Sequence, residues 1–229
     1  EATFTLALNK KTGEEVWRSK AYRPAYGSPV ALEFNGKTYI ATLKTDGLVI
    51  LDAKDGKTVA FQDWRTSFRT NSTTPHILGN RIFLSTGYKR GCAMYEFTGI
   101  ALKEIYTNHN LSNHMNNSVI IGDHLYGFDG NTHMQGPKQL VCMRLADGLV
   151  QWRHDGYRCG SLMAANNQLL VLGEKGNLAV GSASSKGFKP KAETQVLKGR
   201  CWTVPVLANG RIYCRNASGD LVCLDVRAP

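Results

Sequence analysis

Short apolar runs alternate with tight polar turns along the whole chain, and two patterns return at nearly constant spacing. The first pattern is an apolar strand, a turn and a second apolar strand. Its five copies align at Pro29, Pro75, Ser118, Leu162 and Pro205, with spacings of 46, 43, 44 and 43 residues. The turns consist of Asn, Asp and Gly, which accept the positive φ of a type I′ hairpin turn. The pattern therefore predicts five β-hairpins.

A second pattern follows each hairpin and consists of an apolar strand, a polar turn with glycine and another strand. Its six copies begin at Phe4, Gly47, Gly91, Gln139, Gly176 and Gly219. The two patterns together form a module of four short strands in about 43 residues, the size of a propeller blade. No segment keeps a 3.6-residue apolar period, so we expect very little helix. We predict an all-β fold, a β-propeller of four-stranded antiparallel blades. A β-sandwich is the alternative, but it gives no reason for constant spacing.

The first pattern has five copies and the second has six. This difference predicts how the single propeller domain, residues 1–229, is divided into blades. Residues 1–18 are expected to finish a preceding blade, and residues 199–229 to form a last blade without its outer strand. The complete blades are expected at residues 19–65, 66–106, 107–153 and 154–198. This arrangement predicts an incomplete part of a seven- or eight-bladed propeller, with the missing blades supplied by another part of the full-length chain. A closed five-bladed ring is the alternative.

The net charge of the chain and the distribution of its basic residues indicate which classes of partner it can bind. The formal net charge is +10, with 42% hydrophobic and 20% charged residues, as in a globular protein. The basic residues are scattered and form no long run that could follow the phosphates of a nucleic acid, so we expect no nucleic-acid partner. A positive surface favours acidic ligands and leaves association with an anionic membrane surface open.

Six cysteines are present, and none belongs to a CxxC, CxxCH or adjacent pair. These spacings exclude zinc-ribbon and haem-attachment motifs. We expect the thiols to be buried as small apolar groups, although an even number leaves disulfides open. Cys159 and Cys201 are the pair that the alignment brings to neighbouring positions.

Ala7, Asn9, Thr12, Gly13 and Trp17 form the pattern A-x-N-x-x-T-G-x-x-x-W, with degraded copies at residues 52–60 and 144–152. This pattern resembles the tryptophan-docking motif of quinoprotein-type propellers, the PQQ-like repeat family. The chain looks similar to the repeat proteins grouped with the outer-membrane assembly lipoprotein BamB. The resemblance implies that Trp17 and Trp152 pack at the seams between blades. It also implies an extracytoplasmic location, periplasmic or secreted.

The segments that lead into the hairpins differ between modules, although the strands repeat. The alignment places Asn71, His114, Arg158 and Cys201 at equivalent positions. In a propeller these segments border the central funnel, so their side chains are expected to line one end of it. The candidate ligand- or partner-binding residues are Arg69, Asn71, Asn113, His114, Asn116, Arg158, Arg200 and Trp202. Guanidinium and amide groups suit an acidic partner. The alternatives are that any funnel mouth is polar and that Trp202 fills a seam.

The resemblance includes PQQ-dependent alcohol dehydrogenases, which need a carboxylate base and acidic calcium ligands beside the quinone. The aligned positions carry no Asp or Glu, and the adjacent cysteine pair of those enzymes is absent. His109 and His114 lack a third metal ligand, so we predict neither a metal site nor catalytic residues.

We therefore expect a non-catalytic, scaffold-like propeller without cofactor that binds a partner protein or a small acidic ligand at its funnel face. One alternative is a PQQ-dependent oxidoreductase whose PQQ and calcium are held by residues outside this segment. Another is the sensor domain of a larger receptor chain.

Overall fold

The computed structural model describes residues 3–227, and every regular element in that range is a β-strand. The chain divides into two compact units, Glu1–His109 and Asn110–Pro229. The division falls close to the boundary expected between the blades at 66–106 and 107–153. The described range contains no helix that is long and apolar enough to cross a membrane.

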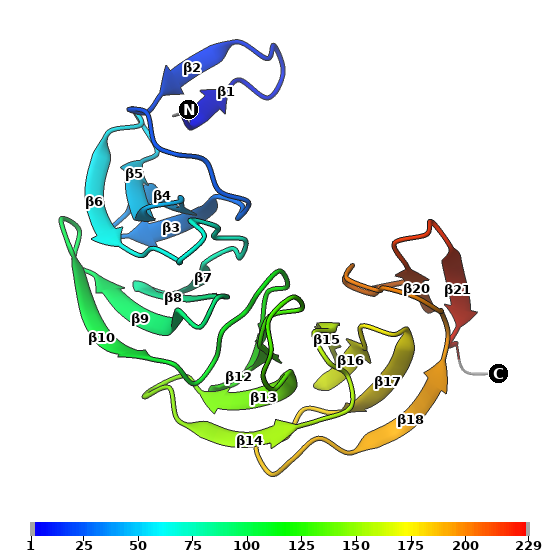
Figure 1. Ribbon diagram of the computed structural model, residues 1–229. Coiled ribbons are helices and arrows are strands. Elements are labelled where there is room, and N and C mark those ends of the chain that lie inside the picture. Colours follow the sequence, from blue (N-terminus) through cyan, green and yellow to red (C-terminus); the bar gives the residue numbers. More distant parts are fainter. Residues whose placement is uncertain (1–2, 228–229) are drawn as a thin grey trace. The chain divides into compact units, whose positions relative to one another are not determined.

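The first unit contains three antiparallel sheets whose strands follow one another in sequence order (Figure 1). The first sheet has two strands, β1 (Leu6–Leu8) and β2 (Glu15–Arg18). The second has four: β3 (Val30–Phe34), β4 (Lys37–Leu43), β5 (Gly47–Asp52) and β6 (Thr58–Asp63). The third also has four: β7 (His76–Leu78), β8 (Arg81–Thr86), β9 (Gly91–Phe97) and β10 (Leu102–Asn108).

The second unit repeats this organisation. Its first sheet consists of β11 (Val119–Ile121), β12 (His124–Asp129), β13 (Gln139–Arg144) and β14 (Val150–His154). Its second consists of β15 (Ser161–Ala165), β16 (Gln168–Leu172), β17 (Asn177–Ser182) and β18 (Pro190–Gln195). Its third has only β19 (Val206–Ala208), β20 (Arg211–Arg215) and β21 (Leu221–Asp225).

The four-stranded antiparallel meanders confirm the predicted all-β module. β10 and β14 end at Asn108 and His154, slightly beyond the blade limits drawn from the sequence. The two-stranded and three-stranded sheets lie in the segments expected to hold partial blades. Residues 1–2 and 228–229 of those segments lie outside the described residues.

The five hairpin turns follow two geometries. Asn35 with Gly36, Asn166 with Asn167, and Asn209 with Gly210 all have positive φ, as a type I′ turn requires. In the turns at Gly79 and Gly122 only the glycine has positive φ, which is the pattern of a type II′ turn. The sequence therefore predicted the position of every turn correctly. The type I′ geometry that it predicted for all five turns occurs in only three of them.

A register shift recurs between the third and fourth strands of each complete sheet and between β1 and β2. Ala7 pairs with Trp17 and Leu8 with Glu15, so that Val16 is an extra residue on the outer strand. Cys142 pairs with Trp152 and Met143 with Val150 in the same way. The same shift makes Val59, Ile105 and Lys191 the extra residues in the other outer strands. A bulge of this kind bends the outer strand and redirects the neighbouring side chain.

The side chain beside the bulge docks on the next sheet in the two modules that carry tryptophan there. The Trp17 Nε1 donates to the Ala53 carbonyl over 2.8 Å, and the Trp152 Nε1 donates to the Ser184 carbonyl over 2.7 Å. Both indoles lie at the predicted seams and are half-buried. The indole N–H thus fixes each seam through a turn carbonyl in addition to apolar contact.

Apolar side chains from adjacent sheets form the cores within each unit. One cluster joins β3–β6 to β7–β10 and includes Leu48, Ile50, Leu84 and Tyr95. A second joins β11–β14 to β15–β18, and a third joins β15–β18 to β19–β21. Each four-stranded sheet therefore buries apolar side chains against a neighbour instead of forming a core alone.

The seam predicts the effect of an added methyl group at Gly56. A Cβ there would stand 3.0 Å or less from three carbon atoms of the Trp17 indole, at a φ of 72°. Gly36 has nearly the same φ, 71°, but nothing lies within 4 Å of its Cβ position. Gly36→Ala should lower the free energy of unfolding by about 1–2 kcal/mol through backbone strain alone. Gly56→Ala should lower it by about 1–3 kcal/mol more, because the indole must move.

Urea unfolding of both variants measures the difference. Equal destabilisation by the two substitutions would mean that Trp17 does not hold the seam.

Candidate functional site

Two kinds of loop meet at the same end of each sheet. The lead-in loop precedes the first strand, and the middle loop joins the second strand to the third. In the first unit the Asn71 Nδ2 donates to the Lys44 carbonyl of a middle loop over 2.8 Å. In the second unit Glu174 N donates to the Tyr157 carbonyl over 3.0 Å, and Ala217 N to the Arg200 carbonyl over 2.8 Å. We call this end the loop end, and the opposite end, which holds the hairpin turns, the turn end.

Glu174 is the central acidic group at the loop end of the second unit. It lies in the middle loop of β15–β18, is 8% exposed, and its carbonyl accepts a hydrogen bond from Cys201 N over 2.9 Å. Its carboxylate accepts from Arg158 Nε over 3.0 Å and from Trp202 Nε1 over 3.2 Å. Glu174 therefore ties the lead-in loop of its own sheet to that of β19–β21.

Aromatic rings and a guanidinium extend from Glu174 in a row. The Arg200 guanidinium lies 4.2 Å from the centre of the Trp202 ring system. His133 meets Trp202 edge-on at 5.7 Å, and His114 meets His133 edge-on at 6.0 Å. Arg200 and His133 are exposed, whereas Trp202 and His114 are half-buried. Because Glu174 fixes the indole, the row has a defined geometry at the surface.

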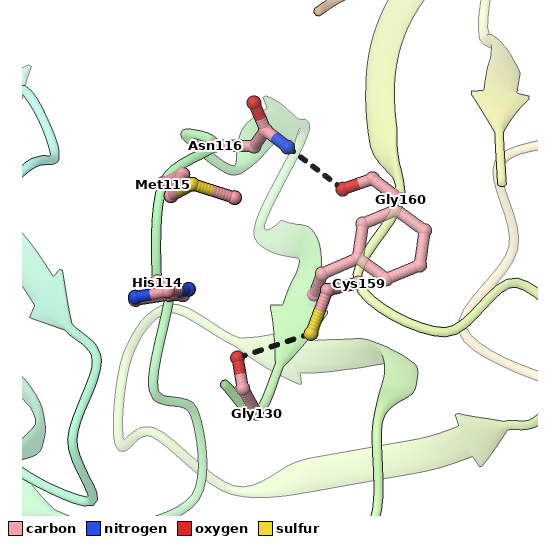
Figure 2. A pocket seen from close by; sticks show the side chains of 7 residues that line it. His114, Met115, Asn116, Gly130, Cys159 and Gly160 are labelled. Carbon is pink, nitrogen blue, oxygen red and sulfur yellow. Dashed lines mark hydrogen bonds between the residues drawn. The ribbon is translucent and has the colours of Figure 1, made fainter. Parts of the chain in front are cut away.

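A small pocket lies beside this row (Figure 2). It is lined by His114, Met115, Asn116, Phe128, Gly130, Cys159 and Gly160. Figure 2 shows the Asn116 Nδ2 donating to the Gly160 carbonyl and the Cys159 thiol donating to the Gly130 carbonyl, over 2.9 and 3.4 Å. Its volume of about 10 Å³ is the space of a single water molecule. The pocket cannot enclose a larger ligand in this form.

A larger open hollow of about 610 Å³ lies at the turn end of β3–β6 in the first unit. It is lined by Lys37, Thr38, Asp52, Ala53, Lys54 and Asp55. Ala53, one of the lining residues, is also the residue whose carbonyl accepts the hydrogen bond from the Trp17 indole. This hollow adjoins a packing contact between sheets.

Burial and pairing set the protonation of the groups in the second unit. Burial alone would raise the pKa of Glu174, but the hydrogen bonds from Arg158 and Trp202 outweigh it and lower the pKa below its usual value. Burial, assisted by the charge of His133, lowers the pKa of His114. Burial raises the pKa of Cys159 to about 12. At neutral pH Glu174 is ionised, His114 is neutral and Cys159 is a thiol.

The structure separates the eight candidate residues by unit and by exposure. In the second unit His114, Asn116, Arg158, Arg200 and Trp202 lie at the loop end with part of each side chain at the surface. Asn113 is 2% exposed, donates to the Phe128 carbonyl and accepts from the Ser118 hydroxyl. Its amide holds the lead-in loop together in place of the ligand contact that we expected.

Arg69 and Asn71 belong to the first unit. Arg69 is exposed in the lead-in loop of β7–β10. Asn71 is fully buried, and its Nδ2 donates to the Lys44, Thr45 and Trp64 carbonyls. These bonds join a lead-in loop to the middle loop of the preceding sheet, so Asn71 also has a structural role in place of the expected one.

Two residues at the loop end of the second unit are absent from the sequence-based set, Glu174 and His133. Both lie in middle loops, whereas the alignment compared only the lead-in segments. Glu174 changes the electrostatics of the loop end, because it pairs with Arg158, one of the guanidinium groups that were expected to face an acidic partner. A comparison of the middle loops, such as Gly173–Gly176, would have identified it.

The six cysteines are free thiols, five of them buried and Cys223 exposed. The disulfide left open between Cys159 and Cys201 is not formed. Within residues 3–227 no three His, Cys, Asp or Glu side chains come together as a metal-binding group.

Comparisons with known proteins identify the fold. The family model described as outer membrane protein assembly factor BamB matches residues 3–227. The crystal structure of BamB from Moraxella catarrhalis is similar with a TM-score of 0.70 at 15% identity, covering 95% of this chain and 65% of that chain. The computationally designed Ika8 protein is similar with a TM-score of 0.71 at 10% identity, covering 96% and 64%. No curated protein sequence matches the chain. The chain thus spans less than two thirds of either structure.

The Glu174 cluster predicts unequal roles for two arginines. Arg158→Ala leaves the buried Glu174 carboxylate with one hydrogen-bond donor fewer, and should lower the free energy of unfolding by about 1 kcal/mol, a value reduced by the partial exposure of Arg158. Arg200→Ala removes only an exposed stacking contact and should cost less than about 0.5 kcal/mol.

The cost of Arg158→Ala should depend on pH. Since pairing lowers the folded-state pKa of Glu174, its stabilisation is present above the unfolded pKa of about 4.3 and is lost as the pH falls through the folded pKa. Denaturant unfolding at pH 7 and at pH 3 measures this dependence. A cost that is the same at both pH values would contradict the assigned pair.

Proposed function

Because the chain belongs to the BamB family of PQQ-like repeat propellers, we propose that it is a non-catalytic, extracytoplasmic scaffold that binds a partner protein at the loop ends of its blades. The observation that carries this proposal is the row of Arg200, Trp202 and His133. Tryptophan and arginine are enriched among the residues that dominate protein-binding energy. Glu174 holds this tryptophan in place before any partner arrives, which lowers the entropic cost of binding.

The size of the pocket favours a macromolecular partner over an enclosed small ligand. Sites for small molecules usually enclose about 300–1,000 Å³, whereas the loop-end pocket has about 10 Å³. A partner protein needs no deep cavity, because it can cover the exposed Arg200 and His133 by surface contact. A small acidic ligand could still pair with Arg200, but only as an open surface contact.

Two acids at the loop end of the second unit, Asp129 and Glu174, are committed to structural bonds, which disfavours a catalytic role for either. Asp129 accepts from Ser112 N over 2.8 Å and pairs with the Arg153 Nη1 over 2.7 Å. Glu174 is held by Arg158 and Trp202. A general base must be able to reach a substrate proton, and both carboxylates already bind protein donors.

We also propose that further blades of the same polypeptide cover the apolar faces of the partial sheets. By register, Leu6 and Leu8 of β1 correspond to Val49 and Leu51 of β5. Val49 and Leu51 are fully buried, whereas Leu6 and Leu8 are 47% and 56% exposed. Side chains that the repeat buries in one module are thus exposed in another, and an additional blade is the neighbour that would bury them.

In-cell photo-crosslinking tests the binding surface. A benzoyl-phenylalanine replacing Arg200 in the full-length protein should form one discrete adduct with another protein. The matched control replaces Lys186, which is also exposed but lies in the turn-end loop between β17 and β18. No adduct at position 200, or equal adducts at both positions, would refute binding at the loop end.

Fractionation of the same cells should place the protein outside the cytoplasm, and recovery in the cytoplasm would refute the proposed location.

A cofactor titration tests the absence of catalysis. PQQ with calcium, added to the full-length protein, should cause neither saturable quenching of tryptophan fluorescence nor dye-linked oxidation of alcohols. Tight binding accompanied by dye reduction would establish the oxidoreductase alternative instead.

A further inference from the structure

A second surface at a loop end lies in the first unit and consists of Phe68, Arg69, Tyr88 and Lys89, which we call the Phe68 platform. Phe68 and Arg69 belong to the lead-in loop between β6 and β7, and Tyr88 and Lys89 to the middle loop between β8 and β9 (Figure 1). The Phe68 and Tyr88 rings are 4.8 Å apart at 50°. Phe68 is 66% exposed, so a large apolar group faces solvent without a covering element.

The platform has an unusual backbone. Eight non-glycine residues in the described range have positive φ, and four of them are asparagines in hairpin turns. Three of the other four are Arg69, Tyr88 and Lys89, with φ of 52°, 59° and 58°. Such conformations cost bulky residues free energy, persist only where the surroundings enforce them, and cluster at functional sites.

Hydrogen bonds hold both loops in these conformations. Arg69 N donates to the Thr66 carbonyl over 3.0 Å, and the Thr66 hydroxyl accepts from Thr70 N over 2.8 Å. The Lys89 carbonyl lies 3.0 Å from the His109 Nδ1. The platform is therefore shaped in advance, which reduces the ordering cost of binding.

The platform is positively charged, and two of the cations in its loops form no ion pair within residues 3–227. Residues 65–71 and 86–91 contain Arg65, Arg69, Lys89 and Arg90 and no acidic residue. Arg65 pairs with Asp46 and Asp63, and Arg90 stacks on Trp64 at 3.6 Å. Arg69 and Lys89 form no ion pair within the described part of the chain. Two unpaired cations thus flank the exposed Phe68 ring and the half-buried Tyr88 ring.

We propose that the Phe68 platform docks an acidic protein segment that carries an aromatic side chain. This inference rests on the proposed binding function and adds a second surface and the chemistry of its partner. The exposed Phe68 ring, packed against the half-buried Tyr88 ring, supplies an apolar anchor site. The two cations supply complementary charge that orients the segment. Two free cations are too few for the polybasic clusters of about 4–8 residues that recognise anionic membranes.

Fluorescence anisotropy on the full-length protein tests the proposal. The probe is a fluorescein-labelled peptide, Asp-Glu-Asp-Phe-Asp-Glu-Asp, with the same peptide carrying Ala in place of Phe as the comparison. The Phe peptide should bind more tightly than the Ala peptide, and its affinity should fall as salt rises. Phe68→Ala and Lys89→Glu should each weaken its binding at least tenfold.

Matched controls come from the same sheet. Ile100→Ala removes an apolar side chain that is 81% exposed at the turn end, and Lys103→Glu reverses an exposed charge on β10. Both should leave the affinity unchanged, and all four variants should keep the parental unfolding midpoint. If Phe68→Ala and Lys89→Glu unfold the protein, Phe68→Leu and Lys89→Gln take their place.

Three outcomes would overturn the proposal: no binding of the Phe peptide, equal binding of both peptides, or equal effects of platform and control variants. Phosphatidylglycerol vesicles that bind the platform more tightly than the peptide would also overturn it, in favour of a membrane. Failure here leaves the adduct at position 200 unaffected, so loss of the platform and loss of the binding function are distinguishable.

Discussion

The third strand of each four-stranded sheet carries buried side chains on both of its faces, and the rest of the structure depends on keeping these side chains out of water. Four residues of β5, Leu48 to Leu51, are fully buried, although successive side chains on a strand point to opposite faces. Burial of one such leucine contributes about 1.5–3 kcal/mol. A single meander cannot obtain this stabilisation alone, so sheet must pack on sheet. The repeat of about 43 residues is the sequence consequence of that constraint.

The bulge in the outer strands and the indole contact fix how one sheet packs against the next. At the bulge the outer strand turns Trp17 and Trp152 onto the turn of the next sheet, where each indole N–H meets a carbonyl. These contacts lie at the turn ends, whereas the middle and lead-in loops lie at the opposite ends. The loop ends are therefore free to vary in side chain, and there Arg200 stacks on Trp202 and Phe68 faces solvent.

The sequence predicted what is repeated and missed much of what occurs once. Strand positions and turn positions follow from periodic spacing, which packing enforces in every module, and the seams of Trp17 and Trp152 follow from the resemblance of the tryptophan motif. Asn71 and Asn113 look like exposed ligands in sequence, but buried carbonyls in loops need amide donors just as ligands do. Glu174 and Tyr88 lie in middle loops, and only the folded sheet brings these loops beside the lead-in loops. Spacing along the chain could not reveal that neighbourhood.

The central claim is that these sheets are blades whose partial members are completed by further blades. Leu221 of β21 is 66% exposed, whereas Leu140, its counterpart in β13, is fully buried. Hydrogen exchange of the full-length protein, followed by mass spectrometry, tests this claim most directly. The account predicts that the amides of β21 that do not bond to β20 exchange as slowly as those of β13, because a fourth strand pairs with them. Exchange of these amides at the rate of an open strand edge would contradict it.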